Sequence, residues 1–224
     1  MNLLTRTNLE KPLLDRHFVA RPRLNAYLSS ALDKQVILVS APPGYGKTTL
    51  LTEWLQTLDL SSAWLSLESE HNDFATFLAY FIAAIQTIHP RLCRDVQLLL
   101  KSPTLPPAGQ LMTLLVNGLS QLSSDIVLVL DDYHRIQDRM VHDFVNALVY
   151  RMPHCLHIVL ASRREPPMSL AQWRAQGYVS EVRAAQLQFT REEMRSYLIR
   201  ETGIEPDDHV MDEVQATTEG WIVE

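Results

Sequence analysis

The feature that most constrains this chain is a nine-residue loop with two glycines, which follows a short apolar run. Residues 35–40 read as a buried strand of a parallel sheet, because their β-branched run ends in a turn. The loop reads Ala41-Pro42-Pro43-Gly44-Tyr45-Gly46-Lys47-Thr48-Thr49, and residues 51–58 repeat apolar side chains at helical spacing. A glycine loop between a strand and a helix turns backbone N–H groups inward and adds the helix dipole. This arrangement predicts a cradle for phosphate groups.

The residue types in the loop suit the parts of a bound nucleotide. Lys47 would supply a mobile positive charge for the β- and γ-phosphates, and the small, hard hydroxyl of Thr48 would be a ligand for Mg²⁺. Ala41 stands where this motif usually has its first glycine, but Gly44 and Gly46 are in register. Although a glycine turn that merely opens a helix is the alternative, the agreement of strand, loop, Lys-Thr pair and helix favours a P-loop that binds ATP or ADP. The nucleotide-binding residues predicted in the loop are Pro43, Gly44, Tyr45, Gly46, Lys47, Thr48 and Thr49.

A second apolar run, residues 126–130, ends in two carboxylates, Asp131 and Asp132. This pattern has the form of a Walker B motif, in which Asp131 would hold Mg²⁺ directly or through water. Asp132 would orient or deprotonate the attacking water. Two acids that cap the next turn are the alternative; the motif is weak alone and strong beside a P-loop. His134 could sense the nucleotide, but a hydrogen-bonded turn histidine is the simpler interpretation, and we do not assign it to the site.

A third apolar run, residues 157–162, ends in two arginines. In P-loop ATPases with an extra strand between the two Walker strands, this position lies beside the γ-phosphate. Arg163 there could distinguish ATP from ADP by a bidentate contact, and we assign it a catalytic role with Lys47 and Asp132. Two solvated surface arginines are the alternative, which fits Arg164 better. Arg174, in the loop expected after this strand, has no spacing argument in its favour.

Strands alternate with helices along most of the chain. The other predicted strands are residues 63–67 and 178–182. The pattern predicts an α/β fold, namely the three-layer α/β/α arrangement of P-loop NTPases with a five-stranded parallel sheet. At Thr190 a capping box begins, and helices follow without strands. We therefore expect a nucleotide-binding domain with an N-terminal lead-in over residues 1–189, and the apparently truncated start of a small helical domain over residues 190–224.

The stretch between the second and third predicted strands should contain two helices. Asn72 and Asp73 are expected to cap the first, whose apolar face recurs from residue 77 to residue 85. A proline-rich loop around residues 103–107 then precedes a second apolar stripe over residues 111–122.

Charge and cysteine usage limit the possible functions. The formal net charge is −6, which makes sequence-independent DNA binding by this segment a poor hypothesis, because such binding needs clustered Lys and Arg. The two cysteines lie far apart and have no metal-binding spacing, so we expect reduced thiols. The N-terminal residues show no apolar signal region, and no apolar run is long enough to cross a membrane. A cytoplasmic protein that makes no membrane contact is expected.

Several segments together resemble a known family. They are Phe18-Val19-Ala20-Arg21-Pro22-Arg23-Leu24, the loop with the following Leu50, Trp64-Leu65-Ser66-Leu67, Leu130-Asp131-Asp132-Tyr133-His134, Ala161-Ser162-Arg163 with Pro166-Pro167, Leu187-Gln188-Phe189-Thr190-Arg191-Glu192-Glu193, and Glu219-Gly220-Trp221. In this order they resemble the ATPase module of the MalT-like, LuxR-type large transcriptional regulators, of the STAND class of signal-transduction P-loop NTPases. Residues 67–73 fit loosely where the family tends to carry aspartates, and we draw no site residue from them.

The resemblance implies that Arg21, in the segment similar to the family's adenine-side lead-in, contacts the nucleotide. It also implies a switch, in which an ADP-bound closed state rests and an inducer with ATP opens it into an oligomer that activates transcription. Winged-helix, helical-repeat and helix-turn-helix parts would follow Glu224, so contact with DNA is expected only through a C-terminal domain. The expected cofactors are ATP or ADP with Mg²⁺.

Three functions are compatible with these residues. The first is a slow regulatory ATPase, in which nucleotide identity sets the conformation and self-association. The second is a mechanical ATPase of the AAA+ kind, which would need a basic nucleic-acid channel that the net charge argues against. The third is a scaffold that binds nucleotide and hardly turns it over. The sequence does not separate the third function from the first, because one loop geometry suits both holding and hydrolysing.

Overall fold

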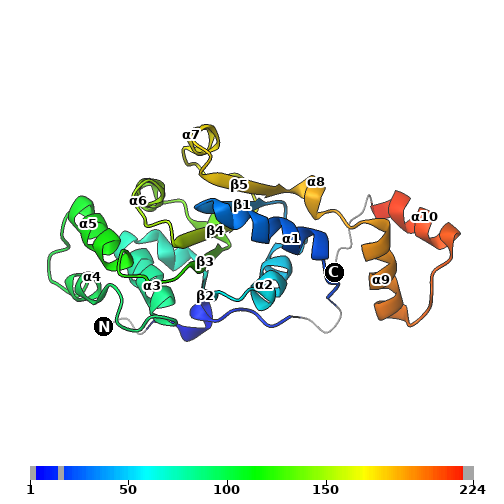
Figure 1. Ribbon diagram of the computed structural model, residues 1–224, viewed down its shortest axis with the longest axis horizontal. Helices are drawn as coiled ribbons and strands as arrows, with labels where there is room; N and C mark the ends of the chain where they lie inside the picture. The colour runs from blue at the N-terminus through cyan, green and yellow to red at the C-terminus, as the bar shows by residue number, and fades with distance from the viewer. Residues whose placement is uncertain (1–3, 15–17, 219–224) are drawn as a thin grey trace.

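A five-stranded parallel sheet forms the centre of the protein, in the strand order β2-β3-β4-β1-β5 (Figure 1). The computed structural model describes residues 4–14 and 18–218. The strands are β1 Val36–Ser40, β2 Ser61–Ser66, β3 Ile126–Asp131, β4 Leu156–Ser162 and β5 Val179–Arg183. Each lies within a residue or two of its predicted position. The predicted α/β fold with a five-stranded parallel sheet is therefore confirmed.

The strand order places β4 between β1 and β3. Ser40 at the end of β1 pairs with Ser162 at the end of β4, and Leu130 of β3 pairs with Leu160 of β4. Because all three strands run in parallel, their carboxyl ends meet at one edge of the sheet. The glycine loop, the acidic pair and the arginine pair all begin at this edge.

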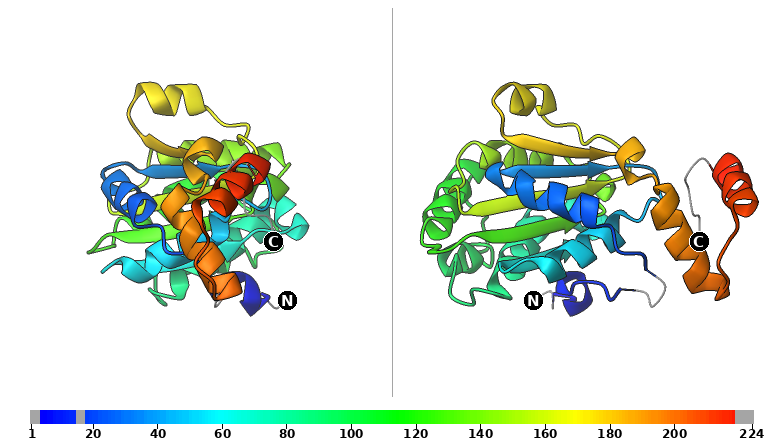
Figure 2. Two further views of the ribbon diagram at one scale, coloured as in Figure 1. Left: turned by 90° about the vertical axis from the view of Figure 1, so that its right-hand side faces the viewer. Right: turned by 45° about the vertical axis from the view of Figure 1, so that its right-hand side comes forward.

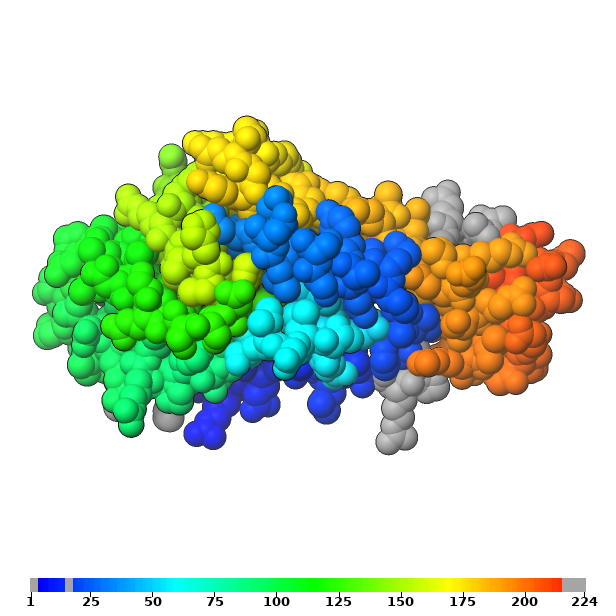
Figure 3. Space-filling view, in the orientation of Figure 1, coloured from blue at the N-terminus to red at the C-terminus, as the bar shows by residue number. Residues whose placement is uncertain are grey.

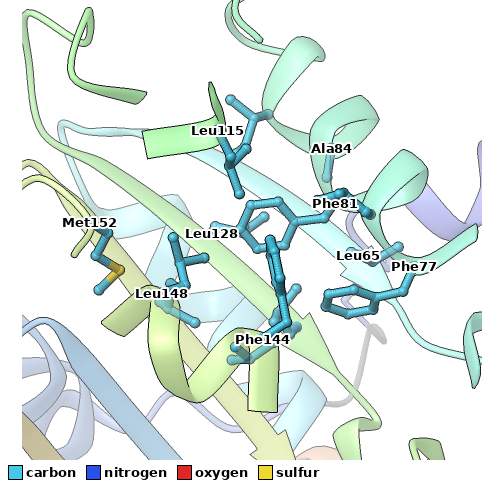
Figure 4. Close-up of a cluster of buried hydrophobic side chains, with 14 of the residues drawn as sticks. Leu65, Phe77, Phe81, Ala84, Leu115, Leu128, Phe144, Leu148 and Met152 are labelled. Atoms are coloured by element: carbon cyan, nitrogen blue, oxygen red, sulfur yellow. The ribbon is translucent and has the colours of Figure 1, made fainter. Parts of the chain in front are cut away.

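Helices cover both faces of the sheet, since the side chains of each strand alternate between the two faces. Val36 and Leu38 pack into one core cluster with α3 Phe74–Gln86, α5 Ala108–Leu119 and α6 Arg139–Val149. Ile37 and Val39 pack into a second cluster with α1 Pro22–Ser30 and α2 Lys47–Thr57. In the larger cluster, Phe77, Phe81 and Phe144 stand over Leu65 and Leu128 (Figure 4). The three-layer arrangement is the predicted one.

The remaining elements are four 3-10 turns and five further α-helices within the described residues. They are the 3-10 turns η1 Arg6–Leu9, η2 Ala31–Asp33, η3 Ser69–Asn72 and η4 Tyr133–Arg135, and the α-helices α4 Arg94–Leu99, α7 Leu170–Ala175, α8 Ala184–Leu187, α9 Arg191–Thr202 and α10 Asp208–Thr218. The sequence did not predict α4, and the prediction of a loop over the α7 segment was wrong. Each helix has six residues, too few to show a helical period, and each is fixed by buried anchors: Val96 in α4, and Leu170 with Trp173 in α7. Among the described residues, no helix has the length and apolar character needed to cross a membrane.

The helices after β5 project from one end of the sheet (Figure 2). Thr190 caps α9, and its capping box with Glu193 is present as predicted. Helices alone follow β5 in the described chain, while the exact domain boundary at residue 189 stays a prediction. The Glu219-Gly220-Trp221 segment and Glu224 lie outside the described residues.

A buried charge cluster fastens α9 to the start of α1. Glu193 accepts hydrogen bonds from Arg21 Nη2 at 3.1 Å and from Arg23 Nε at 3.0 Å. Arg21 also donates to the carbonyl oxygens of Leu187 and Gln188, at 2.7 and 2.8 Å. Burial of the Glu193 carboxylate would raise its pKa. The hydrogen bond from Arg23, the hydrogen bond from the Thr190 backbone, and the charge and hydrogen bond of Arg21 outweigh this and hold the pKa below its usual range. At the surface, the blue segment that begins α1 meets the orange α9 (Figure 3).

Replacing Glu193 by alanine should loosen α9 and destabilise the protein. The change leaves the buried Arg21 guanidinium without its carboxylate and removes half of the capping box, so the free energy of unfolding should fall by about 3 kcal/mol. Urea unfolding measures this. The exposed neighbour Glu192 is the matched control, and its replacement by alanine should change the same quantity by less than about 0.5 kcal/mol. Equal effects of the two variants would contradict the anchoring role of the cluster.

Candidate nucleotide site

The glycine loop connects β1 to α2 at the carboxyl edge of the sheet. Gly44 and Gly46 have φ angles of 81° and 64°, in the left-handed region that favours glycine. Gly46 is the N-cap of α2, so the helix begins at Lys47. Apart from the glycine and its chain neighbours, no heavy atom of the described residues lies within 4 Å of the position that a Cβ would take on either glycine. The backbone of the loop therefore lies open at the N-terminus of α2, as a phosphate cradle requires.

Lys47 lies folded along this loop, with its side chain largely buried. Its Nζ donates to the carbonyl oxygens of Ala41 and Pro42, both at 2.8 Å. Burial lowers the pKa of the ammonium below its usual range, and the nearby Asp131 carboxylate opposes this shift. The amine thus carries two hydrogen bonds to neutral oxygens, which anionic phosphate oxygens could replace with stronger ones.

Thr48 and Asp131 meet directly, although they are 83 positions apart in the sequence. Thr48 Oγ1 donates to Asp131 Oδ2 at 2.9 Å, and Asp131 Oδ1 accepts the backbone N–H of Asp132 at 2.9 Å. Burial raises the pKa of the Asp131 carboxyl, while the hydrogen bond from Thr48 opposes the shift. A hydroxyl and a carboxylate side by side form a set of hard oxygen ligands of the kind Mg²⁺ uses alongside phosphates and water. The two predicted metal ligands therefore fit the ion that the motif implies.

Asp132 follows with a left-handed backbone, at φ 55°, which aspartate tolerates better than most residues. Its half-buried carboxylate has two basic neighbours on the same loop. Oδ1 lies 3.6 Å from His134 Nδ1, and Oδ2 lies 3.4 Å from Arg135 Nε. The charge of Asp132 opposes the lowering of the Lys47 pKa and adds to the raising of the Asp131 pKa, which places it in the same electrostatic neighbourhood.

Arg163 follows β4 directly, and its side chain is exposed at the same edge. After burial, its positive charge is a further cause that lowers the pKa of both Lys47 and His134, so Arg163 lies in the electrostatic neighbourhood of the P-loop, while its sensor role stays a prediction. His134 was left out of the predicted site, yet it lies among these groups. Burial is the main cause that lowers its pKa, which favours the neutral ring at pH 7. The sequence feature that could have assigned His134 to the site is its position two residues after Asp132.

The structure gives Arg21 other contacts. Its guanidinium belongs to the charge cluster beneath α9, and its backbone N–H donates to the Glu53 carboxylate of α2 at 3.2 and 3.3 Å. A contact between Arg21 and adenine stays a prediction. Arg174 pairs with Glu165 and Glu181, so it lies in a surface network beside β5.

The other predicted residues have distinct surroundings. Pro43 and Thr49 are exposed on the loop and on the first turn of α2. Tyr45 is partly buried against the smaller core cluster. Arg164 is exposed, and its backbone carbonyl oxygen accepts a hydrogen bond from Ser162 Oγ at 2.6 Å.

Comparison with known proteins gives a consistent result. A scan against protein families matches residues 20–160 to the family described as AAA ATPase domain. The chain is 31% identical over 195 residues to the HTH-type transcriptional regulator MalT of Klebsiella pneumoniae. The aligned segment covers 87% of this chain and 22% of that protein. The MalT protein of Cronobacter sakazakii matches with the same identity and coverage. The chain therefore spans about a fifth of the length of these curated relatives.

Solved structures share the fold. A STAND protein with a tetratricopeptide repeat sensor from Pyrococcus horikoshii superposes with a TM-score of 0.59 at 16% identity, over 94% of this chain and 29% of the other. A Walker-type ATPase of Pyrococcus abyssi superposes with a TM-score of 0.59 at 14% identity, over 94% of this chain and 66% of the other. With the matched segment, the sheet order and the P-loop in agreement, the chain belongs to the AAA ATPase domain family.

Proposed function

We propose that this chain is the regulatory ATPase module of a MalT-like transcriptional regulator. It binds ATP or ADP with Mg²⁺ and hydrolyses ATP slowly, and the bound nucleotide sets a conformation that controls self-association. The observation that carries the proposal is the hydrogen bond of 2.9 Å between Thr48 and Asp131. It joins the P-loop helix to the acidic strand end, which is the juxtaposition that phosphoryl transfer with Mg²⁺ needs.

Nucleotide binding would use groups that already face one another. Backbone N–H groups of residues 44–49 would receive the phosphates at the N-terminus of α2, while Pro43, which has no N–H, would shape the start of the loop. The Lys47 ammonium would exchange its two carbonyl partners for phosphate oxygens, and Thr48 and Asp131 would hold Mg²⁺. When bound, Mg²⁺ neutralises charge that develops on the phosphates.

Hydrolysis would depend on Asp132 and Arg163. Asp132 would orient the attacking water, and the exposed guanidinium of Arg163 would contact the γ-phosphate and so distinguish ATP from ADP. In the structure the Asp132 carboxylate lies 3.4 Å from Arg135 Nε and also faces His134. An Asp132 carboxylate engaged with Arg135 would have to release that contact before it orients water, which supports a slow enzyme.

The same contact favours a second candidate, a scaffold that binds nucleotide with negligible turnover. If the pairing of Asp132 with Arg135 persists in the ATP complex, no carboxylate in this loop is free to act on water. The two functions differ in one measurable quantity, the single-turnover rate of ATP hydrolysis by the purified chain.

Control of conformation would pass through the helices after β5. Glu53 of α2 accepts the backbone N–H of Arg21, whose side chain pairs with Glu193 of α9. The P-loop helix is therefore connected to α9 through one residue. DNA binding would belong to other parts of such a regulator, in the bacterial cytoplasm, because the match to the HTH-type regulators that this chain resembles covers only 22% of their length.

Replacing Lys47 by alanine should abolish tight nucleotide binding. The change removes a charge-assisted hydrogen bond to phosphate, so ADP affinity should fall by about 10- to 100-fold or more. The nucleotide that co-purifies is released by denaturation and identified by chromatography, and affinities follow from titration calorimetry. Wild-type protein that binds neither ADP nor ATP in the presence of Mg²⁺ would contradict the P-loop assignment.

Replacing Asp132 by asparagine should separate hydrolysis from binding. Asparagine also tolerates the left-handed backbone, so the loop should keep its shape while the carboxylate is lost. We expect the single-turnover rate to fall by about 100-fold with an unchanged ATP dissociation constant. Asp125→Asn, at the exposed opposite end of β3, is the matched control and should leave the rate unchanged. Equal rates for wild type and Asp132→Asn would favour a different base.

Replacing Arg163 by alanine should remove the preference for ATP over ADP. Loss of a bidentate contact to the γ-phosphate should weaken ATP binding by about 10-fold or more and leave ADP binding unchanged. Arg164→Ala removes the same charge one residue later and serves as the control. Parallel losses for both nucleotides, or equal effects of the two variants, would contradict the sensor role of Arg163.

A further inference from the structure

Asn72 has contacts that a helix cap does not explain. Both Asn72 and Asp73 were expected to cap the next helix. The structure assigns that role to Asp73 alone, whose carboxylate accepts from Thr76 N at 2.8 Å. The side-chain amide of Asn72 points instead at the loop between β3 and α6, more than 60 positions away.

Every hydrogen-bonding position of the Asn72 amide is used. Its Oδ1 accepts from Gln137 N at 2.6 Å and from Asp138 N at 3.0 Å. Its Nδ2 donates to the carbonyl oxygens of Ser69 and Arg135, both at 3.0 Å. A primary amide offers two acceptor positions and two donor hydrogens, so the side chain is fully satisfied by backbone groups.

The residue type follows from this pattern. Aspartate would keep the acceptor positions but would place negative charge against the carbonyl oxygens of Ser69 and Arg135. Alanine would release all four backbone groups. Of the side chains with this length, only asparagine offers two donor hydrogens together with two acceptor positions.

The loop that Asn72 holds is the one that carries Asp132. It starts in the left-handed conformation of Asp132 and ends at Asp138, which caps α6 by accepting from Val141 N at 3.1 Å. Between them, the fully buried Tyr133 has its hydroxyl 3.1 Å from His142 Nδ1 of α6. Tyr133 and Asp138 fix the loop to α6, whereas Asn72 fixes it to the connection after β2.

We propose that Asn72 is a positioning residue, which holds the β3–α6 loop so that the Asp132 carboxylate stays aligned for hydrolysis. This inference rests on the proposed ATPase function. Asn72 bonds to the backbone of Arg135, Gln137 and Asp138, which lies within six residues of Asp132. Small misplacements of a catalytic group cost large factors in rate, so loosening this loop should lower turnover. The P-loop makes none of these contacts, and nucleotide affinity should therefore be preserved.

The first test compares steady-state and single-turnover ATP hydrolysis in the full chain. Asn72→Ala should lower kcat by about 10-fold or more with less than a twofold change in KM for ATP. Thr76→Ala is the matched control, because it removes a hydroxyl bond to Asp73 in the same segment without touching the loop. Urea unfolding of each variant identifies a loss of activity that comes only from a less stable fold.

The second test does not use activity. The backbone N–H groups of Gln137 and Asp138 donate to Asn72, so their hydrogen exchange should be slow in wild type and at least about 10-fold faster in Asn72→Ala. Thr76→Ala should leave these rates unchanged.

The outcomes separate the two claims. Faster exchange together with lower kcat at constant KM supports the positioning role. Unchanged kcat in Asn72→Ala, or unchanged exchange of both amides, overturns it while wild-type hydrolysis stands. A wild-type protein that binds ATP but shows no hydrolysis removes the proposed ATPase function, and the positioning role falls with it.

Discussion

The hydrogen bond between Thr48 and Asp131 depends on one topological constraint, the position of β4 between β1 and β3. Three parallel strands in register must end at the same edge of the sheet. The P-loop, the acidic pair and Arg163 lie at the carboxyl ends of these strands. The topology alone therefore brings the site residues to one edge of the sheet. Because both faces of the sheet are covered, the strands are apolar along their length and polar residues gather where the strands end.

The site has opposed charges that burial makes costly. Lys47 and Asp131 are both largely buried, and burial shifts the pKa of each toward its neutral form. The positive charge of Lys47 and the negative charge of Asp131 each stabilise the charged form of the other. In the structure, two carbonyl oxygens of the loop accept hydrogen bonds from Lys47, and the Thr48 hydroxyl donates one to Asp131. Phosphate oxygens and Mg²⁺ would supply stronger partners for both groups. The proposed affinity for nucleotide thus follows from the unfavourable environment of these two residues.

The sequence predicted the sheet and its layers, and it pointed to the residues that the structure brings to one edge of the sheet, because those features depend on local patterns. Strands that are buried on both faces read as apolar runs, and the glycines, Lys47 and Thr48 stand at fixed offsets from one of them. The sequence did not predict α4 and α7, which are too short to show a period and are fixed by tertiary contacts such as that of Trp173. It also missed the side-chain contacts of Asn72 and Arg21, because both residues bond to segments far away in the chain. Contacts between residues so far apart in the sequence do not produce a local sequence pattern.

If Thr48 and Asp131 form a Mg²⁺ site, as we propose, ATP binding should depend on the ion. Titration calorimetry of ATP into the purified chain, with Mg²⁺ and with Mg²⁺ removed by a chelator, tests this for wild type and for Asp131→Asn. We expect Mg²⁺ to tighten ATP binding to wild type by about 10-fold or more and to have little effect on the variant. Equal affinity for ATP with and without Mg²⁺ in wild type would contradict this proposal.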